Sequence, residues 1–355
     1  MRGRFLSVLV PGILTLGLVI GLPMVGLAAR SSPEAIAPPS EGLLSQAQEN
    51  PPWGFIDRGG KVVIEAQFED AYSFSQGLAP IKFRGRYGYI DRNGKMSIQP
   101  QYEEAYAFSE GLARIKFNGR YGFIQRNGRL RIPAKYEDAT GFVDGLAGVK
   151  EGGRWGYIRD NSRYVIDPQF EEAREFAEGL AAVKINGKWG FIDKRGEVVI
   201  PARFDAVQPF SDGVAAIQMT QKWGLIDRNG RTAVAVNYDR LSSMAEGLSA
   251  AQRDGKWGFI NKSGRAMIPF QYEDALPFSE GLAAVKQGDR YGYINKNNQR
   301  VITPRYDRAF HFIDGLAPVK QNDRFGFINS RGQFVIPARF QEAYYFAEGL
   351  ARIQP

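Results

Sequence analysis

The sequence predicts an all-β repeat domain, and three observations support this fold class. Within each copy, apolar residues alternate with a period of two, as they do in strands. In later copies a Leu-Ala-x-Val/Ile strand precedes the strand that carries the aromatic-Gly pair. The first copy has no such preceding strand, and the domain ends with one that has no partner. An aromatic-Gly pair also recurs every 34 residues, at Trp53, Tyr87, Tyr121, Trp155, Trp189, Trp223, Trp257, Tyr291 and Phe325. We expect nine three-stranded antiparallel units over residues 53–355, stacked face to face in a propeller-like closed ring, with an open β superhelix as the alternative.

The segment before the repeats has the composition of an export signal followed by a tether. Residues 1–29 begin with two arginines, continue with a long apolar run and end in small residues, as a secretory signal peptide does. The run is also almost long enough to span a bilayer, so an uncleaved anchor is the alternative. Residues 30–52 are rich in Pro, Ser and Gln and are expected to form a flexible tether. We therefore expect an exported protein located in the periplasm, at the cell surface or outside the cell, with membrane contact only through an uncleaved anchor.

The elements of one unit are clearest in the seventh copy. Its central strand is expected at Trp257–Asn261, followed by a tight turn and a return strand at Arg265–Ile268. Pro269 is expected to end the return strand, because proline cannot donate a ladder hydrogen bond. The segment Phe270–Glu280 is expected to be a one-turn helix or an irregular loop, and Leu282–Lys286 the third strand. The 34-residue period also occurs in tetratricopeptide hairpins, but the repeated Gly and Pro argue against helices here.

Stacking of neighbouring units follows from the central strand, which is apolar on both faces. One face carries aromatic residues and the other carries isoleucine, so each sheet has to be covered on both sides by its neighbours. We expect the glycine after the first aromatic to let the next unit's aromatic approach closely. The unit at 223–256 departs from the repeat pattern at Leu225 and Val234 and lacks the proline. It is expected to be the least stable, since Met244, Ser249 and Ala251 remove apolar volume from positions that its siblings fill.

The repeat is similar to a known family. The segment WGFIDKRGEVVIPARF at Trp189–Phe204, followed by FSDGVAAIQ at Phe210–Gln218, resembles the WG-containing repeat, or KWG repeat, of bacterial proteins. The resemblance covers all nine copies, although Tyr or Phe replaces Trp in four of them. It implies an exported interaction module.

Composition argues against several classes of function. The chain has no cysteine and one histidine, His311, which excludes thiolate and multi-histidine metal sites and leaves little material for a Ser/His/Asp triad. The formal net charge is +8, and without Arg2, Arg4 and Arg30, which lie in or beside the expected signal segment, it is +8 − 3 = +5. This is a mild excess spread through the repeats, so we expect no nucleic acid partner. We expect no cofactor, no metal and no catalytic site, and hence no enzyme.

Acidic residues recur at two positions of each unit, and a catalytic pair would be needed only once. We expect them to cap turns or to pair with the lysines at Lys82, Lys116, Lys150, Lys184, Lys286 and Lys320. The first series is Glu69, Glu103, Glu137, Glu171, Asp205, Asp239, Glu273 and Asp307. The second is Glu110, Asp144, Glu178, Asp212, Glu246, Glu280, Asp314 and Glu348.

Residues that vary between copies are better candidates for binding, because packing has not fixed them. The two residues before the loop phenylalanine are aromatic mainly in the first two and last two copies, so ring closure would gather a candidate binding patch of Tyr72, Tyr106, Phe310, His311, Tyr344 and Tyr345. Separate packing of these side chains in their loops is the alternative. We expect a non-catalytic exported scaffold that mediates protein–protein interaction in the cell envelope. The alternative is a module that binds a cell-wall or exopolysaccharide chain by stacking exposed aromatics on its sugars.

Overall fold

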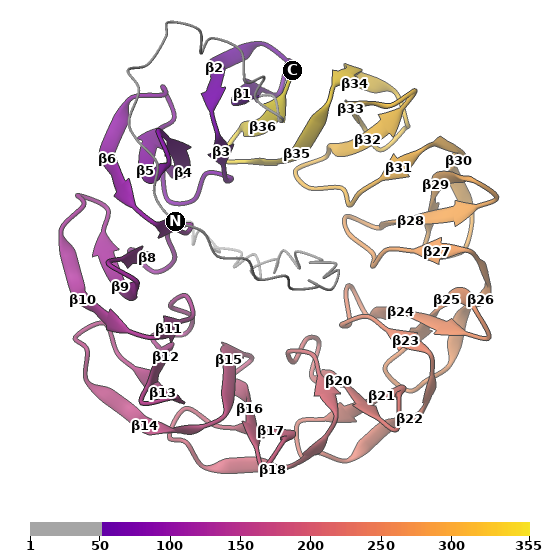
Figure 1. Ribbon diagram of the computed structural model, residues 1–355. Coiled ribbons are helices and arrows are strands. Elements are labelled where there is room, and N and C mark those ends of the chain that lie inside the picture. The colour runs from indigo at the N-terminus through magenta and orange to yellow at the C-terminus, as the bar shows by residue number, and fades with distance from the viewer. Residues whose placement is uncertain (1–51) are drawn as a thin grey trace, which may run out of the picture. The chain divides into compact units, whose positions relative to one another are not determined.

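Nine sheets of four antiparallel strands form a closed ring in the computed structural model, which describes residues 52–355 (Figure 1). We call these sheets blades I to IX. Blades I to VIII each hold four consecutive strands beginning with β3, and blade IX combines β35 and β36 with β1 and β2. The expected signal or anchor at residues 1–29 and nearly all of the expected tether at 30–52 lie outside the described residues. In the described part of the chain, no helix is long and apolar enough to cross a membrane.

Strands of the same rank take equivalent places in every blade. The inner strands are β3 (Asp70–Ala71), β7 (Glu104–Ala105), β11 (Asp138–Ala139), β15 (Glu172–Ala177), β19 (Ala206–Val207), β23 (Arg240–Leu241), β27 (Asp274–Ala275), β31 (Arg308–Ala309) and β35 (Glu342–Ala347). The second strands are β4 (Leu78–Phe83), β8 (Leu112–Phe117), β12 (Ala147–Glu151), β16 (Leu180–Ile185), β20 (Val214–Met219), β24 (Leu248–Arg253), β28 (Leu282–Gln287), β32 (Ala317–Gln321) and β36 (Leu350–Gln354).

The third and outer strands complete each blade. The third strands carry the aromatic-Gly pair and are β5 (Arg86–Asp91), β9 (Arg120–Gln125), β13 (Arg154–Ile158), β17 (Lys188–Ile192), β21 (Lys222–Asp227), β25 (Lys256–Asn261), β29 (Arg290–Asn295), β33 (Arg324–Ile328) and β1 (Trp53–Asp57). The outer strands are β6 (Met96–Tyr102), β10 (Leu130–Tyr136), β14 (Tyr164–Phe170), β18 (Val198–Phe204), β22 (Thr232–Tyr238), β26 (Ala266–Tyr272), β30 (Arg300–Tyr306), β34 (Phe334–Phe340) and β2 (Val62–Phe68).

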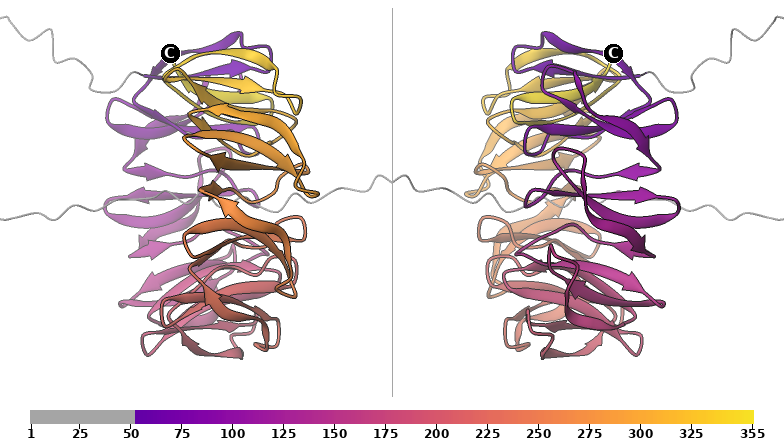
Figure 2. Two further views of the ribbon diagram at one scale, coloured as in Figure 1. Left: turned by 90° about the vertical axis from the view of Figure 1, so that its right-hand side faces the viewer. Right: turned by 90° about the vertical axis from the view of Figure 1, so that its left-hand side faces the viewer.

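The two ends of the repeat domain pair with each other, which confirms the closed ring and excludes the open superhelix. β1 pairs antiparallel with β36, from Gly54 opposite Ile353 to Asp57 opposite Leu350. Figure 2 shows β1 and β2 in indigo beside β36 in yellow. The carboxylate of Glu348 also accepts a hydrogen bond from the Gly77 N–H at 2.9 Å, which links blade IX to blade I.

Each blade has four strands rather than the expected three, because part of the expected helix or loop forms the inner strand. In blade VII this strand is only Asp274–Ala275, paired with Lys286 and Val285 of the second strand. The expectation for Pro269 was also wrong, since β26 runs through it from Ala266 to Tyr272. Proline is tolerated there because β26 is an edge strand whose N–H groups on one side need no partner.

The glycine of the aromatic-Gly pair serves the blade's own outer strand and not the neighbouring aromatic. A Cβ on Gly258 would lie 2.6 Å from the Ile268 carbonyl oxygen and 2.9 Å from the Phe270 nitrogen. The register between β25 and β26 shifts there, since Trp257 lies opposite Tyr272 while Phe259 lies opposite Ile268. The irregular backbone of the outer strand therefore crosses directly over the glycine, and a side chain at this position would displace it.

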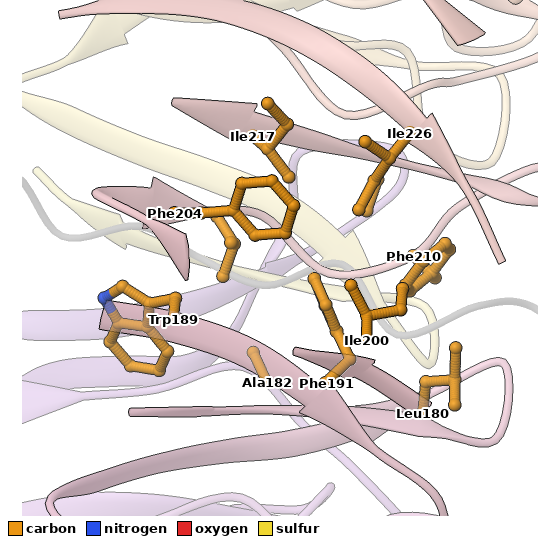
Figure 3. Packing of buried hydrophobic residues seen from close by; sticks show 11 residues of the cluster. Leu180, Ala182, Trp189, Phe191, Ile200, Phe204, Phe210, Ile217 and Ile226 are labelled. Atoms are coloured by element: carbon orange, nitrogen blue, oxygen red, sulfur yellow. The ribbon is translucent and has the colours of Figure 1, made fainter. Parts of the chain in front are cut away.

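The core lies between the blades, as expected from the two apolar faces of each sheet. Figure 3 shows one such cluster, in which Trp189, Phe191 and Phe204 of blade IV meet Phe210 and Ile217 of blade V. At eight junctions an aromatic ring of the third strand packs on the loop phenylalanine of the next blade, with centroids 4.8–5.1 Å apart. Such pairs add to the free energy of burial, by about 0.5–1.5 kcal/mol each.

The junction between blades V and VI has no such aromatic pair. Leu225 and Met244 take the two positions, both almost fully buried, and Ala251 stands where the other copies have Val or Ile. Ser249, in contrast, replaces an alanine and loses no apolar volume, and its hydroxyl donates to the Ser242 carbonyl at 2.6 Å. The sequence unit at 223–256 therefore supplies residues to both of the blades that meet at this junction.

We expect the V–VI junction to open first, because it has lost the aromatic contact and the larger aliphatic side chain. Hydrogen exchange followed by mass spectrometry should show faster exchange of strand amides within residues 223–256 than within the equivalent residues 257–290. Equal protection of the two segments would contradict this expectation.

Candidate functional site

The variable residue pairs follow the inner strand in seven blades and lie within it in blades IV and IX, in each case before the buried phenylalanine or, in blade VI, Met244. In blade I the Tyr72 N–H donates to the Pro80 carbonyl at 2.9 Å, so inner-strand pairing extends through the first variable residue. The equivalent bond joins Tyr106 to Arg114 in blade II and Thr140 to Gly148 in blade III. Because the inner strands face the centre of the ring in Figure 1, the first variable residue of these blades is held near that centre.

Arg352 connects the variable residues of blades IX and I. The junction between these two blades, where the two ends of the repeat domain meet, is called the seam. Its guanidinium carbon lies 3.8 Å from the Tyr344 ring centroid, 5.0 Å from that of Trp53 and 5.4 Å from that of Tyr72. Its Nη1 donates to the Ala71 carbonyl of blade I. Burial lowers the pKa of Arg352, but the arginine remains charged at any physiological pH. Tyr72 and Tyr344 are thus brought together through a shared cation.

The aromatic residues of blades VIII and IX form a second group. The Tyr345 ring lies 6.2 Å from Phe310 and 6.4 Å from His311, and its hydroxyl accepts the His311 N–H at 3.3 Å. Burial lowers the pKa of the His311 imidazole, whose Nδ1 lies 3.1 Å from the Pro277 carbonyl oxygen. Burial also raises the pKa of Tyr345 to about 12. At neutral pH His311 and Tyr345 are therefore uncharged, and the histidine links three successive blades.

Tyr106 lies in a separate group one blade further on. The Arg114 guanidinium stacks on its ring at 3.6 Å, and its hydroxyl donates to Glu104 at 2.7 Å. The same carboxylate accepts the Tyr121 hydroxyl at 2.8 Å. The six candidate residues therefore fall into three groups, of which the first two share blade IX.

An open cleft of about 450 Å³ adjoins the Arg352 group at the seam between blades IX and I. It is lined by Trp53, Glu69, Asp70, Lys82, Tyr87 and Gln354. The Tyr87 hydroxyl donates to the Asp70 carboxylate at 2.7 Å. Burial, together with this hydrogen bond, raises the pKa of Tyr87, so the hydroxyl keeps its proton. The cleft thus combines an indole with carboxylate acceptors and an ammonium donor.

The repeated acidic residues are used in turns and ion pairs. In the first series, Glu69, Glu103, Glu137 and Glu171 accept backbone N–H groups of the following hairpin, such as Gly85 at 3.0 Å from Glu69. Where a residue of this series forms an ion pair, its cation precedes the aromatic-Gly pair, as in Lys256–Glu273 at 3.2 Å, and is not one of the lysines expected from sequence. In the second series, Glu110 accepts the Gly145 N–H of the next blade at 2.9 Å, and the same contact recurs around the ring.

The turn at Asp91–Gly94 is held by the side chain of its own first residue. The Asp91 carboxylate accepts the backbone N–H groups of Asn93 and Lys95, which makes the Asp-x-x-Gly segment an ordinary side-chain-capped turn. Over residues 52–355, no cluster of three His, Asp or Glu side chains could hold a metal ion.

The signature aromatics are unequal in burial. Tyr121, Trp155, Trp189 and Phe325 are buried, whereas Trp53, Tyr87, Trp223, Trp257 and Tyr291 are half-buried. Arg352, Arg114 and Gln354 were not identified from the sequence as site residues, although two features of the repeats point to them. The third residue of the Leu-Ala-x-Val/Ile strand is arginine in only two copies, and glutamine replaces the usual lysine beside three of the tryptophans.

Nine antiparallel blades, closed by the pairing of the domain's first strand (β1) with its last (β36) inside blade IX, define a nine-bladed β-propeller. The chain belongs to the WG containing repeat family, as the sequence indicated. The family model matches nine consecutive segments, at residues 53–87, 87–121, 121–155, 155–189, 189–223, 223–257, 257–291, 291–324 and 325–354. No curated protein matches the sequence.

The chain is similar in fold to several solved structures. The crystal structure of the eukaryotic initiation factor aligns with a TM-score of 0.60 at 10% identity, over 86% of this chain and 99% of that chain. Kluyveromyces lactis Hsv2 aligns with a TM-score of 0.38 at 12% identity, over 71% and 92% of the two chains. The extracellular domain of a one component system from B. thetaiotaomicron gives 0.34 at 9% identity, over 82% and 52%. At 10% identity the likeness to the initiation factor is one of fold alone.

Proposed function

We propose that this protein is a non-catalytic exported scaffold that binds a protein partner in the cell envelope through blades VIII, IX and I. The observation that carries the proposal is the run of partly exposed aromatic side chains from Phe310 through Tyr345 and Tyr344 to Tyr72, with Arg352 between Tyr344 and Tyr72. Tyrosine, tryptophan and arginine are the side chains that dominate the free energy of protein–protein binding. Tyr72 offers the largest exposed part, 39% of its surface.

Rigidity of these side chains supports a binding role. Ring closure holds Tyr72 and Tyr344 on neighbouring blades, and stacking on Arg352 restricts both rings. Side chains that are ordered before binding lose less conformational entropy when a partner arrives. A partner that covers this sector therefore gains more net affinity per contact than it would from mobile loops.

The non-catalytic and exported parts of the proposal have separate support. The acidic residues, which would be the first candidates for acid–base work, cap turns or bind cations in most blades. The basic end and apolar run of residues 1–29 have the order of an export signal.

Site-specific photo-crosslinking in intact envelopes tests the proposed partner. We expect a photoreactive phenylalanine analogue at Tyr72 or Phe310 to give a discrete adduct with the same envelope protein. The analogue at Thr140, which holds the Tyr72 position in blade III, is the matched control and should give none. Adducts that are equal at all three positions, or absent from Tyr72 and Phe310, would refute the assigned sector.

A further inference from the structure

The cleft between blades IX and I differs from most junctions in the residue beside its aromatic ring. In five blades a lysine of the second strand lies 5.2–6.0 Å from the centroid of the ring that opens the third strand, as Lys184 does with Trp189. At the seam this position is Gln354. It follows Ile353, which pairs with Gly54, so the glutamine lies opposite Trp53. A neutral amide thus takes the place of the ammonium beside this indole.

The VI–VII junction provides an internal comparison, because it has the same six residue types as the cleft. They are Gln252, Trp257, Glu273, Asp274, Lys286 and Tyr291. There Lys256 forms an ion pair with Glu273 at 3.2 Å, and the Gln252 amide donates to the Gly255 carbonyl in the hairpin that joins β24 to β25. Side chains of the same type are therefore partly occupied at that junction.

The seam lacks the ion pair of that junction. The residue before Trp53 is Pro52, which has no ammonium, and no ion pair of Glu69 is found within residues 52–355. Lys82 contacts the Tyr87 ring at 5.9 Å but forms no ion pair in the described residues. The Glu69 carboxylate and the Lys82 ammonium can therefore meet a ligand without first giving up an ion pair.

We propose that this cleft binds a saccharide unit of a glycan chain, a ligand class beyond the proposed protein partner. A sugar ring has an apolar C–H face, which can stack on the Trp53 indole, and a rim of hydroxyls that both donate and accept hydrogen bonds. Asp70 and Glu69 supply acceptors for the hydroxyl protons, while Lys82 supplies donors for the ring and hydroxyl oxygens. The volume of about 450 Å³ is within the range of small-ligand sites.

Contacts with two neighbouring side chains hold the Trp53 indole in place. The Tyr344 ring lies 5.6 Å from it and the Arg352 guanidinium lies 5.0 Å from its centroid. The Asp70 carboxylate is also oriented, since its two oxygens accept the Ala71 N–H at 2.8 Å and the Tyr87 hydroxyl at 2.7 Å. Each carboxylate oxygen retains a lone pair for a further donor. The Trp53 indole and the Asp70 carboxylate are therefore both ordered before a ligand binds.

Calorimetric titration of the full chain with N-acetylchitohexaose and with cellohexaose tests the proposal and distinguishes an amino-sugar chain from a neutral glucan. We expect at least one probe to bind. Asp70→Asn should weaken that binding by about tenfold or more, since a hydrogen bond to a charged acceptor is lost. Asp274→Asn, the matched change at the VI–VII junction, should leave the affinity unchanged. Glu69→Gln and Glu273→Gln form a second matched pair with the same expected contrast.

Thermal unfolding of each variant shows that the ring is intact before affinities are compared. A saturation-transfer spectrum of the bound probe should show contact of the sugar C–H protons with an aromatic ring, as stacking on Trp53 requires. The proposal is overturned if neither probe binds, if binding survives Asp70→Asn and Glu69→Gln, or if the changes at Asp274 and Glu273 weaken it equally.

Discussion

Deletion of residues 350–355 is expected to destabilise the entire ring and not only its last blade. These residues form β36, which lies inside the sheet of blade IX and pairs with both β35 and β1. Leu350, Ala351 and Ile353 are almost fully buried in the clusters on the two sides of that blade. Removal of one buried Leu or Ile side chain costs about 2–5 kcal/mol, so the loss approaches the total stability of an ordinary domain.

The measurement is urea unfolding followed by circular dichroism and by tryptophan fluorescence. In a closed ring both signals should shift to lower urea, because opening one blade exposes the faces of its two neighbours. Deletion of residues 31–36, which precede the described part of the chain, is the control and should leave the midpoint unchanged. A main transition that does not move after removal of residues 350–355 would argue against a ring whose stability depends on closure.

A circular permutant separates the strand from the position of the chain ends. Joining residue 355 to residue 52 through a short linker, with new ends in the turn at Asn93–Gly94, keeps every strand pair of blade IX. We expect the free energy of unfolding of this permutant to stay close to that of the original chain, unlike that of the deletion variant. The same permutant also places a connection beside Trp53, so its affinity for saccharide probes reports on access to the cleft.

Closure was predictable from the sequence because both chain ends carry half of one pattern. The lone third strand at Trp53–Asp57 and the lone second strand at Leu350–Gln354 each lack the partner that the other supplies. The inner strands were not predictable in the same way. Asp274–Ala275 is too short to show an alternating pattern, and its pairing depends on the tertiary position of the second strand.

The sequence predicted which loops come together at the candidate site, but not which side chains contact one another there. Ring closure places the variable loops of the first and last copies side by side, as the sequence indicated, and Tyr72 and Tyr344 meet there. They meet through Arg352, however, whose position in an alternating strand gives no sign that its guanidinium crosses to the Ala71 carbonyl of the next blade. The cleft was not predictable, because the lack of an ion pair at Glu69 follows from Pro52 standing where the VI–VII junction has Lys256, and this difference shows only when the two junctions are compared.

Replacement of Trp189 by alanine is expected to cost far more stability than the same change at Trp223, although both open a third strand. Trp189 is 5% exposed and packs with Phe204 in the cluster between blades IV and V. Its ring also carries the Arg174 guanidinium at 4.5 Å, and Arg174 donates to the Val207 carbonyl of blade V at 2.6 Å. Trp223 is only half-buried.

The expected loss of unfolding free energy for Trp189→Ala is about 3–5 kcal/mol, the usual range for removal of a buried aromatic side chain. Trp223→Ala should lose clearly less, because part of its surface already contacts water and leaves a smaller cavity when removed. Equilibrium urea unfolding of the two variants gives the comparison. Trp189→Phe keeps an aromatic face for Arg174 and should recover part of the loss. Equal losses at Trp189 and Trp223 would mean that these tryptophans stabilise the ring through their strands and not through the side-chain contacts between blades.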